Sequence, residues 1–437
     1  MSGNGFAIVG GGLLGMTIAQ SLAKAGRRVA LFESAKTLGG LASAWQIDDV
    51  TWDRYYHVTL QSDQAVRSLL DELGLDREMC WRKTKTGFYH AGRLYPFSTA
   101  ADFLRFPLLG PVEKLRLAAT VLYASRFRDW RALESVSVQD WLTRLSGKAV
   151  FDKIWRPLLL AKLGEDYRST SATFIWATIQ RMYAARNSGM KEEFFGYLPG
   201  GYARMLCTYE RSLRNLGVDL HLGSEVRLIQ QNEKHELAVQ LQSGSQLPFE
   251  QVVVTAPAPI VGRLCPQLNE HEKSCLDRVS YLGIICASAL LQTALSGCYI
   301  TNIVDESIPF TGVIEMSALV DPAQFGNRHL IYVPRYLRSD DSDFERSDDD
   351  LRREIIAALK RMYSFLTDEH ILAVRISRSK YVFPRPTVGT HDFLPTRTSL
   401  PGLTLVNSAH IVNGTLNANE TIRLAQKEAF RLNAHFN

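Results

Sequence analysis

The chain has 437 residues, of which 46% are hydrophobic and 22% are charged, values that are ordinary for a globular protein of two or three domains with a sizeable core. The formal net charge of +5 is too small an excess at this length to indicate a nucleic-acid-binding protein, although it is compatible with an anionic substrate or membrane surface. The six cysteines form no CxxC pair and no cluster with histidines, so we predict no metal site.

The N-terminal segment bears on the location of the protein. Residues 6–9 already form an apolar run that belongs to the fold, so no signal peptide is expected. Together with the unpaired cysteines, this predicts a cytoplasmic protein whose cysteines are small buried residues. A peripheral position at the inner face of the membrane stays an alternative.

A glycine-rich motif follows the first predicted strand. The apolar run at residues 6–9 is typical of a buried parallel strand, and the next six residues match G-x-G-x-x-G. Residues 16–25 then have the spacing of a helix, and residues 28–32 have that of a second strand. This order predicts a βαβ unit that binds a dinucleotide, rather than a structural turn.

Each residue of this motif has a physical role. Gly10 permits the tight turn, Gly12 lets the backbone approach a pyrophosphate, and Gly15 lets the helix pack against the strand. Leu14 lies in the first helical turn, where free N–H groups and the helix dipole favour phosphate. Glu33 ends the second strand and can accept hydrogen bonds from a ribose hydroxyl.

A second glycine pair follows Glu33. Gly39, Gly40 and Leu41 form a loop in which two adjacent glycines let the backbone lie close to a long ligand. This arrangement resembles the extended FAD signature of the amine oxidase superfamily, which includes protoporphyrinogen oxidases, phytoene desaturases and, more distantly, UDP-galactopyranose mutases. The resemblance implies FAD as the cofactor. The chain has no second G-x-G-x-x-G motif, so a separate nicotinamide domain is not expected.

The resemblance extends through most of the chain and is closest to bacterial protoporphyrinogen-oxidase-like flavoproteins. It implies an α/β fold in which a Rossmann-like FAD-binding domain carries an inserted α+β substrate domain with a helical part and a mixed sheet. The FAD-binding domain is expected to comprise residues 1–85, 196–261 and 383–437. The substrate domain is expected to comprise a helical part at 86–195 and a sheet part at 262–382.

Local patterns predict several further elements. Residues 85–96 form a hairpin, and Ser137 to Asp140 resemble a capping box that opens a helix. Residues 279–304 carry no charge, yet their many polar residues and glycines favour buried strands over a membrane-spanning helix. Residues 340–354 are rich in charge and are expected to form a solvated loop and helix start.

The resemblance also assigns cofactor contacts in the second half of the chain. Val226 is expected to contact adenine through its backbone. The family often has an acid on the ribityl chain after the last strand, whereas this chain has Asn407 and Ser408, of which Ser408 is expected to hydrogen-bond. The last helix is expected to point its N-terminus at the flavin with three residues: Asn419, Glu420 and Thr421.

A flavin carries the redox step itself, so the protein mainly has to orient the substrate. The candidates for the pocket are Tyr55, Tyr56, His57, Lys162, Arg385, His410, Asn413 and Asn417. His57, His410 and Tyr56 are the candidate catalytic residues, with core packing as the alternative for each. Lys162 and Arg385 are candidates either for binding an anionic group or for structural ion pairs.

Residues 104–109 and 112–127 combine bulky apolar side chains with basic ones. They are interpreted either as an amphipathic core helix or as a segment that lies on a membrane surface and admits a lipid-like substrate.

Three functions remain open. The leading hypothesis is an FAD-dependent oxidoreductase that transfers hydride from a small organic or lipid-like substrate to flavin N5, as an oxidase, dehydrogenase or desaturase. The second is a redox-neutral mutase or isomerase that acts on a nucleotide-sugar or lipid-linked sugar. The third is a non-catalytic flavin-binding protein.

Overall fold

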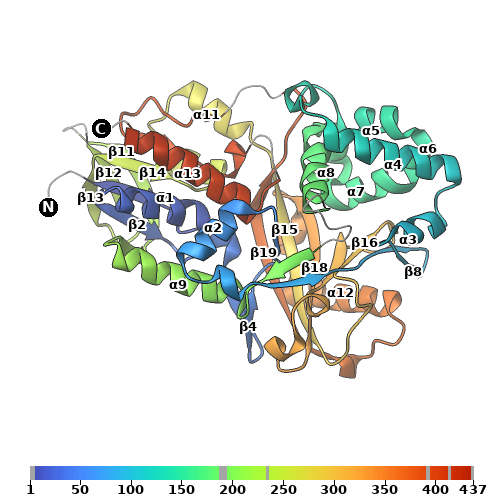
Figure 1. Cartoon of the computed structure of the whole chain (residues 1–437). Helices are drawn as coiled ribbons and strands as arrows, with labels where there is room; N and C mark the ends of the chain where they lie inside the picture. The colour runs from blue at the N-terminus through green and yellow to red at the C-terminus, as the bar shows by residue number, and fades with distance from the viewer. Residues whose placement is uncertain (1–4, 187–193, 233–235, 390–393, 412–414, 435–437) are drawn as a thin grey trace.

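A parallel five-stranded sheet forms the centre of the region that contains the N-terminus (Figure 1). The computed structural model describes residues 5–186, 194–232, 236–389, 394–411 and 415–434. The strands run in the order β10 (Asp219–Leu222), β2 (Val29–Glu33), β1 (Phe6–Val9), β14 (Gln251–Val254) and β20 (Leu403–Leu405). The three central strands are apolar on both faces because both faces are covered.

Helices cover one face of this sheet and a smaller sheet covers the other. The first face packs against α1 (Leu13–Lys24), α2 (Gln64–Glu72), α9 (Gly201–Asn215) and α13 (Ala418–Ala434). The C-terminal helix α13 lies directly beside α1, as Figure 1 shows. The second face packs against β11 (Val226–Gln231), β12 (Leu237–Leu241), β13 (Gln246–Phe249), α10 (Ala258–Leu264) and α11 (Glu270–Asp277).

A mixed seven-stranded sheet forms the second region. Its order is β19 (Ile371–Pro384), β15 (Tyr281–Leu291), β18 (His329–Arg338), β17 (Gly312–Glu315), β16 (Ile300–Ile303), β7 (Thr86–His90) and β8 (Arg93–Pro96). Alternate side chains of β15 face opposite ways, since Ile285 and Ala287 pack toward α12 (Asp348–Met362) while Ile284 and Cys286 pack toward residues 53–56. All eleven residues of β15 are buried, which explains why the segment carries no charge.

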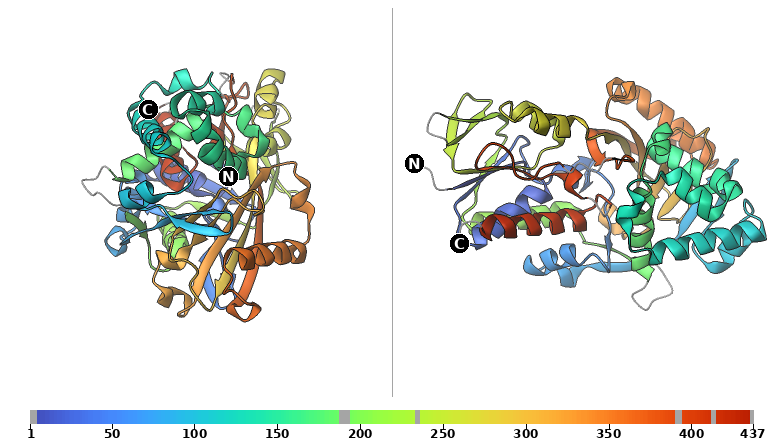
Figure 2. Two further views of the ribbon diagram at one scale, coloured as in Figure 1. Left: turned by 90° about the vertical axis from the view of Figure 1, so that its right-hand side faces the viewer. Right: turned by 90° about the horizontal axis from the view of Figure 1, so that it is seen from above.

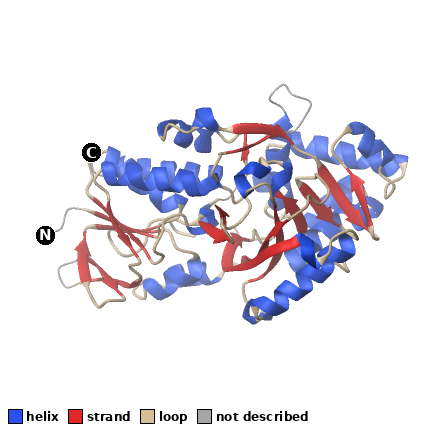
Figure 3. Cartoon of the chain, turned by 90° about the horizontal axis from the view of Figure 1, so that it is seen from below, coloured by secondary structure: helices blue, strands red, loops and turns tan. Residues whose placement is uncertain are grey.

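A group of helices lies at the end of the molecule away from the N-terminus (Figures 2 and 3). It comprises α3 (Ala100–Arg105), α4 (Pro111–Arg126), α5 (Val138–Ser146), α6 (Lys148–Val150), α7 (Arg156–Leu163) and α8 (Thr173–Arg186), with a π-helical turn at Phe151–Trp155. The Ser137 hydroxyl accepts a hydrogen bond from the Asp140 N–H at 3.0 Å, so the predicted N-terminal cap of α5 is confirmed.

Two small sheets join the regions. One pairs β3 (Ala44–Ile47) with β4 (Val50–Asp53), and the other runs β5 (Thr59–Leu60), β9 (Phe194–Tyr197) and β6 (Cys80–Lys83). The chain therefore passes from the parallel sheet to the mixed sheet through short strands, and the segment between β4 and β5 faces both.

The predicted α/β fold class is confirmed, as are the hairpin at 85–96 and the strands within 279–304. The domain boundaries stay predictions; the one after residue 261 falls inside α10. The expectation that the cysteines are buried is wrong for Cys207, which is exposed, and for Cys80, which is partly exposed. Within the described residues, no helix has the length and apolar character needed to cross a membrane.

Candidate functional site

The glycine motif between β1 and α1 is fixed by its own packing. Gly10 has a φ of 116°, and a Cβ on it would lie 2.3 Å from the Thr255 hydroxyl. A Cβ on Gly15 would lie 2.0 Å from the Gly10 carbonyl oxygen. These two positions therefore need glycine for the fold itself, whether or not a ligand binds.

Gly12 differs from its neighbours because it faces open space. A Cβ on Gly12 would have the Gly39 carbonyl oxygen, 4.0 Å away, as its nearest neighbour. The Gly39 N–H donates to the Gly11 carbonyl at 2.8 Å, which holds the second glycine loop beside the first. Helix α1 begins after Gly12 without a side-chain cap, so its first N–H groups stay available. This cradle at a helix N-terminus fits a pyrophosphate.

Glu33 lies beside the same turn. Its carboxylate accepts hydrogen bonds from the Gly11 N–H at 2.7 Å and from the Ala35 N–H at 2.8 Å. The Ser224 N–H donates to the Glu33 carbonyl at 2.9 Å and so brings the start of β11, with buried Val226, next to this acid. The structure thus gathers the residues predicted for the adenosine end of the cofactor, and their roles stay predictions.

The C-terminal segment uses its polar side chains within the protein. Asn407, 1% exposed, donates from its amide to the Ala256 carbonyl at 3.0 Å, whereas Ser408 is only partly buried. The Asn417 side chain caps α13 by accepting from the Glu420 N–H at 3.0 Å. Asn419 accepts from the Ala65 N–H at 2.9 Å and so ties α13 to α2.

Two further candidates, Thr421 and Asn413, belong to this segment. The Thr421 hydroxyl donates to the Asn417 carbonyl at 2.8 Å, within the first turn of α13. Asn413 lies outside the described residues.

Residues 53–57 form a buried polar cluster with α9. Asp53, 2% exposed, accepts from the Tyr202 N–H at 2.7 Å, and its second carboxylate oxygen lies 3.5 Å from His57 Nδ1. The His57 ring stacks on the Tyr202 ring with centroids 4.6 Å apart. The Tyr332 hydroxyl donates to the Asp53 carbonyl at 2.5 Å. Asp53 was not among the residues predicted from the sequence, although an acid that ends a strand four residues before His57 was the available signal.

Tyr56 meets two residues from distant segments. Its hydroxyl lies 2.8 Å from the Tyr336 hydroxyl on β18, and Lys162 Nζ on α7 lies 2.9 Å from the centroid of the Tyr336 ring. Burial raises the pKa of Tyr56 to about 12 and lowers the pKa of Lys162 well below its ordinary value. All three side chains nevertheless keep some accessible surface. They therefore form a partly exposed polar cluster rather than part of the core.

Several buried polar atoms near these segments lack partners among the described residues. They include Trp45 Nε1, Tyr55 Oη and His410 Nε2. The strand that carries Trp45 and the turn that carries His410, Ser408–His410, both contact β19. Because buried polar groups are normally hydrogen-bonded, unpaired atoms on segments that meet at β19 fit a bound polar ring system such as a flavin.

His410 is partly buried with its Nε2 atom shielded from solvent, and this desolvation lowers its pKa to about 4. Since an unfolded histidine has a pKa of about 6.5, the unfolded chain binds more protons between these values, and stability should fall as the pH falls through that window. We expect a loss of about 2 kcal/mol between pH 7 and pH 5 from this residue. Urea unfolding of His410→Gln should lack that part of the loss, whereas His271→Gln, at an exposed position, should keep it.

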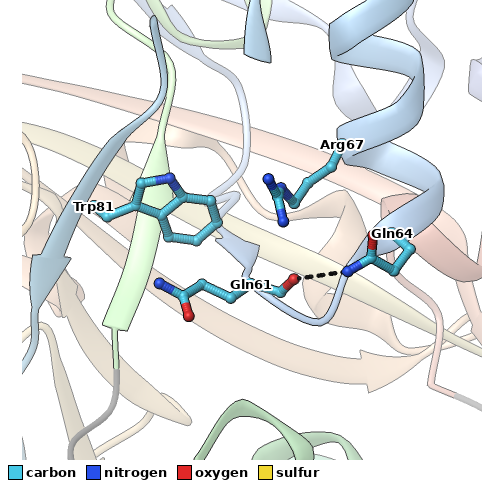
Figure 4. Close-up of a pocket in the computed structure, with 4 residues that line it drawn as sticks. All are labelled: Gln61, Gln64, Arg67 and Trp81. Atoms are coloured by element: carbon cyan, nitrogen blue, oxygen red, sulfur yellow. Dashed lines mark hydrogen bonds between the residues drawn. The ribbon is translucent and has the colours of Figure 1, made fainter. Parts of the chain in front are cut away.

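A separate open recess of 420 Å³ lies beside the start of α2 (Figure 4). Gln61, Gln64, Arg67 and Trp81 line it, and Arg67 lies over the Trp81 ring at 5.9 Å while pairing with Asp76. No residue predicted from the sequence lines this recess.

Comparison with solved structures shows the same fold in several flavoproteins. A protein of Exiguobacterium sp. 255-15, provisionally assigned as a protoporphyrinogen oxidase, is 18% identical with a TM-score of 0.78 over 100% of both chains. Putrescine oxidase bound to putrescine is 21% identical with a TM-score of 0.76 over 99% of both. Reduced UDP-galactopyranose mutase is 14% identical with a TM-score of 0.72, over 99% of this chain and 94% of that one.

Curated relatives are similar at the level of sequence. The 15-cis-phytoene desaturase of Arabidopsis thaliana is 25% identical over 394 residues, which are 83% of this chain and 66% of that protein. The corresponding protein of Solanum lycopersicum is 25% identical over 285 residues, 60% of this chain and 47% of that protein. The matches thus cover about half to two thirds of these longer relatives.

The family model described as flavin containing amine oxidoreductase matches residues 15–429. The predicted resemblance is confirmed, and a flavin is the cofactor of this family. Because the match spans most of the chain, this protein belongs to the flavin-containing amine oxidoreductase family.

Proposed function

We propose that the protein is an FAD-dependent oxidoreductase that removes hydride from a small organic or lipid-like substrate. The observation that carries this proposal is the open cradle at Gly12, together with the Arg54 N–H, which donates to the Ser43 carbonyl at 2.9 Å and so holds residues 53–57 beside the end of the second glycine loop. FAD, rather than a shorter flavin, is supported by Glu33 and the start of β11, which leave a place for an adenosine. The redox chemistry, acceptance of hydride at N5, is supplied by the flavin when it is bound.

The chain's own residues would hold and orient the substrate. Asp53 and Tyr202 fix the His57 ring, and because Nδ1 faces Asp53, Nε2 is the atom left to hold a proton of the substrate. Burial keeps Tyr56 protonated at neutral pH, so its hydroxyl can donate to a substrate oxygen. These roles remain part of the proposal.

The first test is the visible spectrum of the purified protein before and after anaerobic dithionite. We expect bands near roughly 370 and 450 nm that bleach on reduction, as for a redox-active flavin. Release of the cofactor and mass analysis should identify FAD. A colourless protein that fails to take up added FAD would contradict the proposal.

The same preparation separates the remaining hypotheses. An oxidoreductase substrate should bleach the oxidised flavin anaerobically. A redox-neutral mutase or isomerase would act only after reduction and without net oxidation of its substrate. A flavin that no donor reduces would point to a non-catalytic protein.

We also propose that the helical region contacts an anionic membrane surface, which would deliver a lipid-like substrate. On α4, Val112, Leu115 and Leu122 share one face and are 40–72% exposed, and Leu104 on α3 is 68% exposed. Helix α4 thus buries one apolar face and exposes another, which differs from an ordinary amphipathic core helix. The exposed charged residues between 93 and 126 are all arginines: Arg93, Arg105, Arg116 and Arg126.

Flotation with vesicles of phosphatidylcholine and phosphatidylglycerol tests the contact. Leu104→Glu combined with Leu115→Glu should weaken binding to anionic vesicles by about tenfold or more, because two large apolar groups no longer insert. Phe365→Glu combined with Phe430→Glu changes exposed apolar residues elsewhere, at 48% and 76% exposure, and should leave binding unchanged. Equal binding by both variants, or none by the wild type, would refute the membrane contact.

A further inference from the structure

Lys162 is a largely buried cation that no acid in the described part of the chain neutralises. It lies in the last turn of α7, with Nζ 2.9 Å from the centroid of the Tyr336 ring. Among the described residues it forms no ion pair with a carboxylate, and burial is the sole cause of its lowered pKa. Asp166, one turn further along the chain, is already paired with Arg338 at 3.4 Å and lies 3.8 Å from Arg385.

Two other interior cations have acids beside them. Arg385 donates to the Ser169 hydroxyl at 3.0 Å and lies beside Asp166, and Arg181 forms a two-pronged pair with Asp63 at 2.8 and 2.9 Å. Arg385 is therefore a structural residue. Arg54, over the Trp45 ring at 5.5 Å, also forms no ion pair among the described residues. Because burying an unpaired amine is costly, the position of Lys162 still requires a reason.

The neighbours of Lys162 suit a ligand that accepts hydrogen bonds. The Tyr56 and Tyr336 hydroxyls share one hydrogen bond, which uses one of their two hydrogens and leaves the other to donate. The ring of Tyr336 faces the amine and favours its protonated form. A negatively charged oxygen group bound between Lys162 and the two tyrosines would accept hydrogen bonds from both the ammonium and the free hydroxyl.

We propose that Lys162 binds the anionic head, a carboxylate or phosphate, of an organic substrate whose remaining part extends along Tyr56 toward residues 53–57. This assignment rests on the proposed function in one respect, that the site is a substrate pocket. The binding of an anion at Lys162 does not depend on it. Lys162 is thus a specificity residue, and the substrate class is an organic anion.

Calorimetric titration of the purified holoprotein with hexanoate and with 1-hexanol tests the assignment, because the two probes share a chain length and differ in charge. Wild type should bind hexanoate more tightly than 1-hexanol. Lys162→Met, which keeps the side-chain length, should weaken hexanoate binding by about tenfold or more and leave 1-hexanol unchanged. Lys148→Met, at a side chain 81% exposed, should change neither.

A second measurement needs no variant. Because burial lowers the pKa of the amine and a bound carboxylate favours its ammonium form, hexanoate binding by the wild type should take up more proton as the pH is raised, detected as a dependence of the binding heat on the ionisation enthalpy of the buffer. Tyr56 and Tyr336, the titratable groups that face the amine, have raised pKa values and stay neutral. Equal affinity for the two probes, or equal loss in the Lys162→Met and Lys148→Met variants, would overturn the assignment. Flavin content, recorded in the same preparations, tests the proposed function separately.

Discussion

Gly12→Val is expected to give a folded protein that has lost its flavin. A side chain at Gly12 would meet no protein atom closer than about 4 Å at its Cβ, so the chain itself tolerates it. The same side chain would occupy the space in which a pyrophosphate approaches the free N–H groups of α1. Loss of two charge-assisted hydrogen bonds to the pyrophosphate predicts that the affinity for the flavin cofactor falls by about 100-fold or more.

Two matched variants make this result specific. Gly15→Val should fail to fold, because its Cβ would lie 2.0 Å from the Gly10 carbonyl oxygen. Gly262→Val, in α10 with no atom within 4 Å, should keep both fold and flavin. Flavin per chain after dialysis, circular dichroism and the thermal midpoint distinguish the three. A Gly12→Val protein with wild-type flavin content would show that the cradle is not the cofactor site.

Asp53→Ala is expected to lower the free energy of unfolding by about 3 kcal/mol, since it leaves the buried Tyr202 N–H without an acceptor and frees the His57 ring. Asp53→Asn keeps an acceptor for Tyr202 but removes the charge beside His57. It should therefore destabilise the protein less while still impairing the reaction of the flavin with substrate.

Urea unfolding at neutral pH measures the stability of both variants. Anaerobic reduction of the flavin by substrate measures the impaired reaction of Asp53→Asn. Asp321→Ala is the control, because this acid pairs with Arg82 at 3.3 Å on the surface and accepts from the Ala323 N–H at 3.0 Å as a helix cap, and the loss of both contacts together should cost only about 1 kcal/mol. If Asp53→Ala were as stable as Asp321→Ala, Asp53 would not be the anchor of this cluster.

The parts of the fold that could be predicted from the sequence depend on local constraints. Gly10 and Gly15 must be glycine because of contacts within one βαβ unit, so the motif and its neighbours in sequence were sufficient. The uncharged segment at 279–304 was predicted as strands because its polar residues and glycines exclude a spanning helix, and β15 is buried on both faces. Ser137 caps α5 through an atom three residues away.

Tertiary structure decided what local pattern could not. Lys162 and Arg385 were equivalent candidates in the sequence, and they differ because Asp166 pairs with Arg385 while an aromatic ring from β18 faces Lys162. Likewise, Asp53 gains its role only when Tyr202, 149 residues later, presents its N–H. Sequence periodicity thus determined which segments form strands, helices and the glycine cradle. Whether a charge is paired or left for a ligand depends on contacts between distant segments, because charges interact through space rather than along the chain.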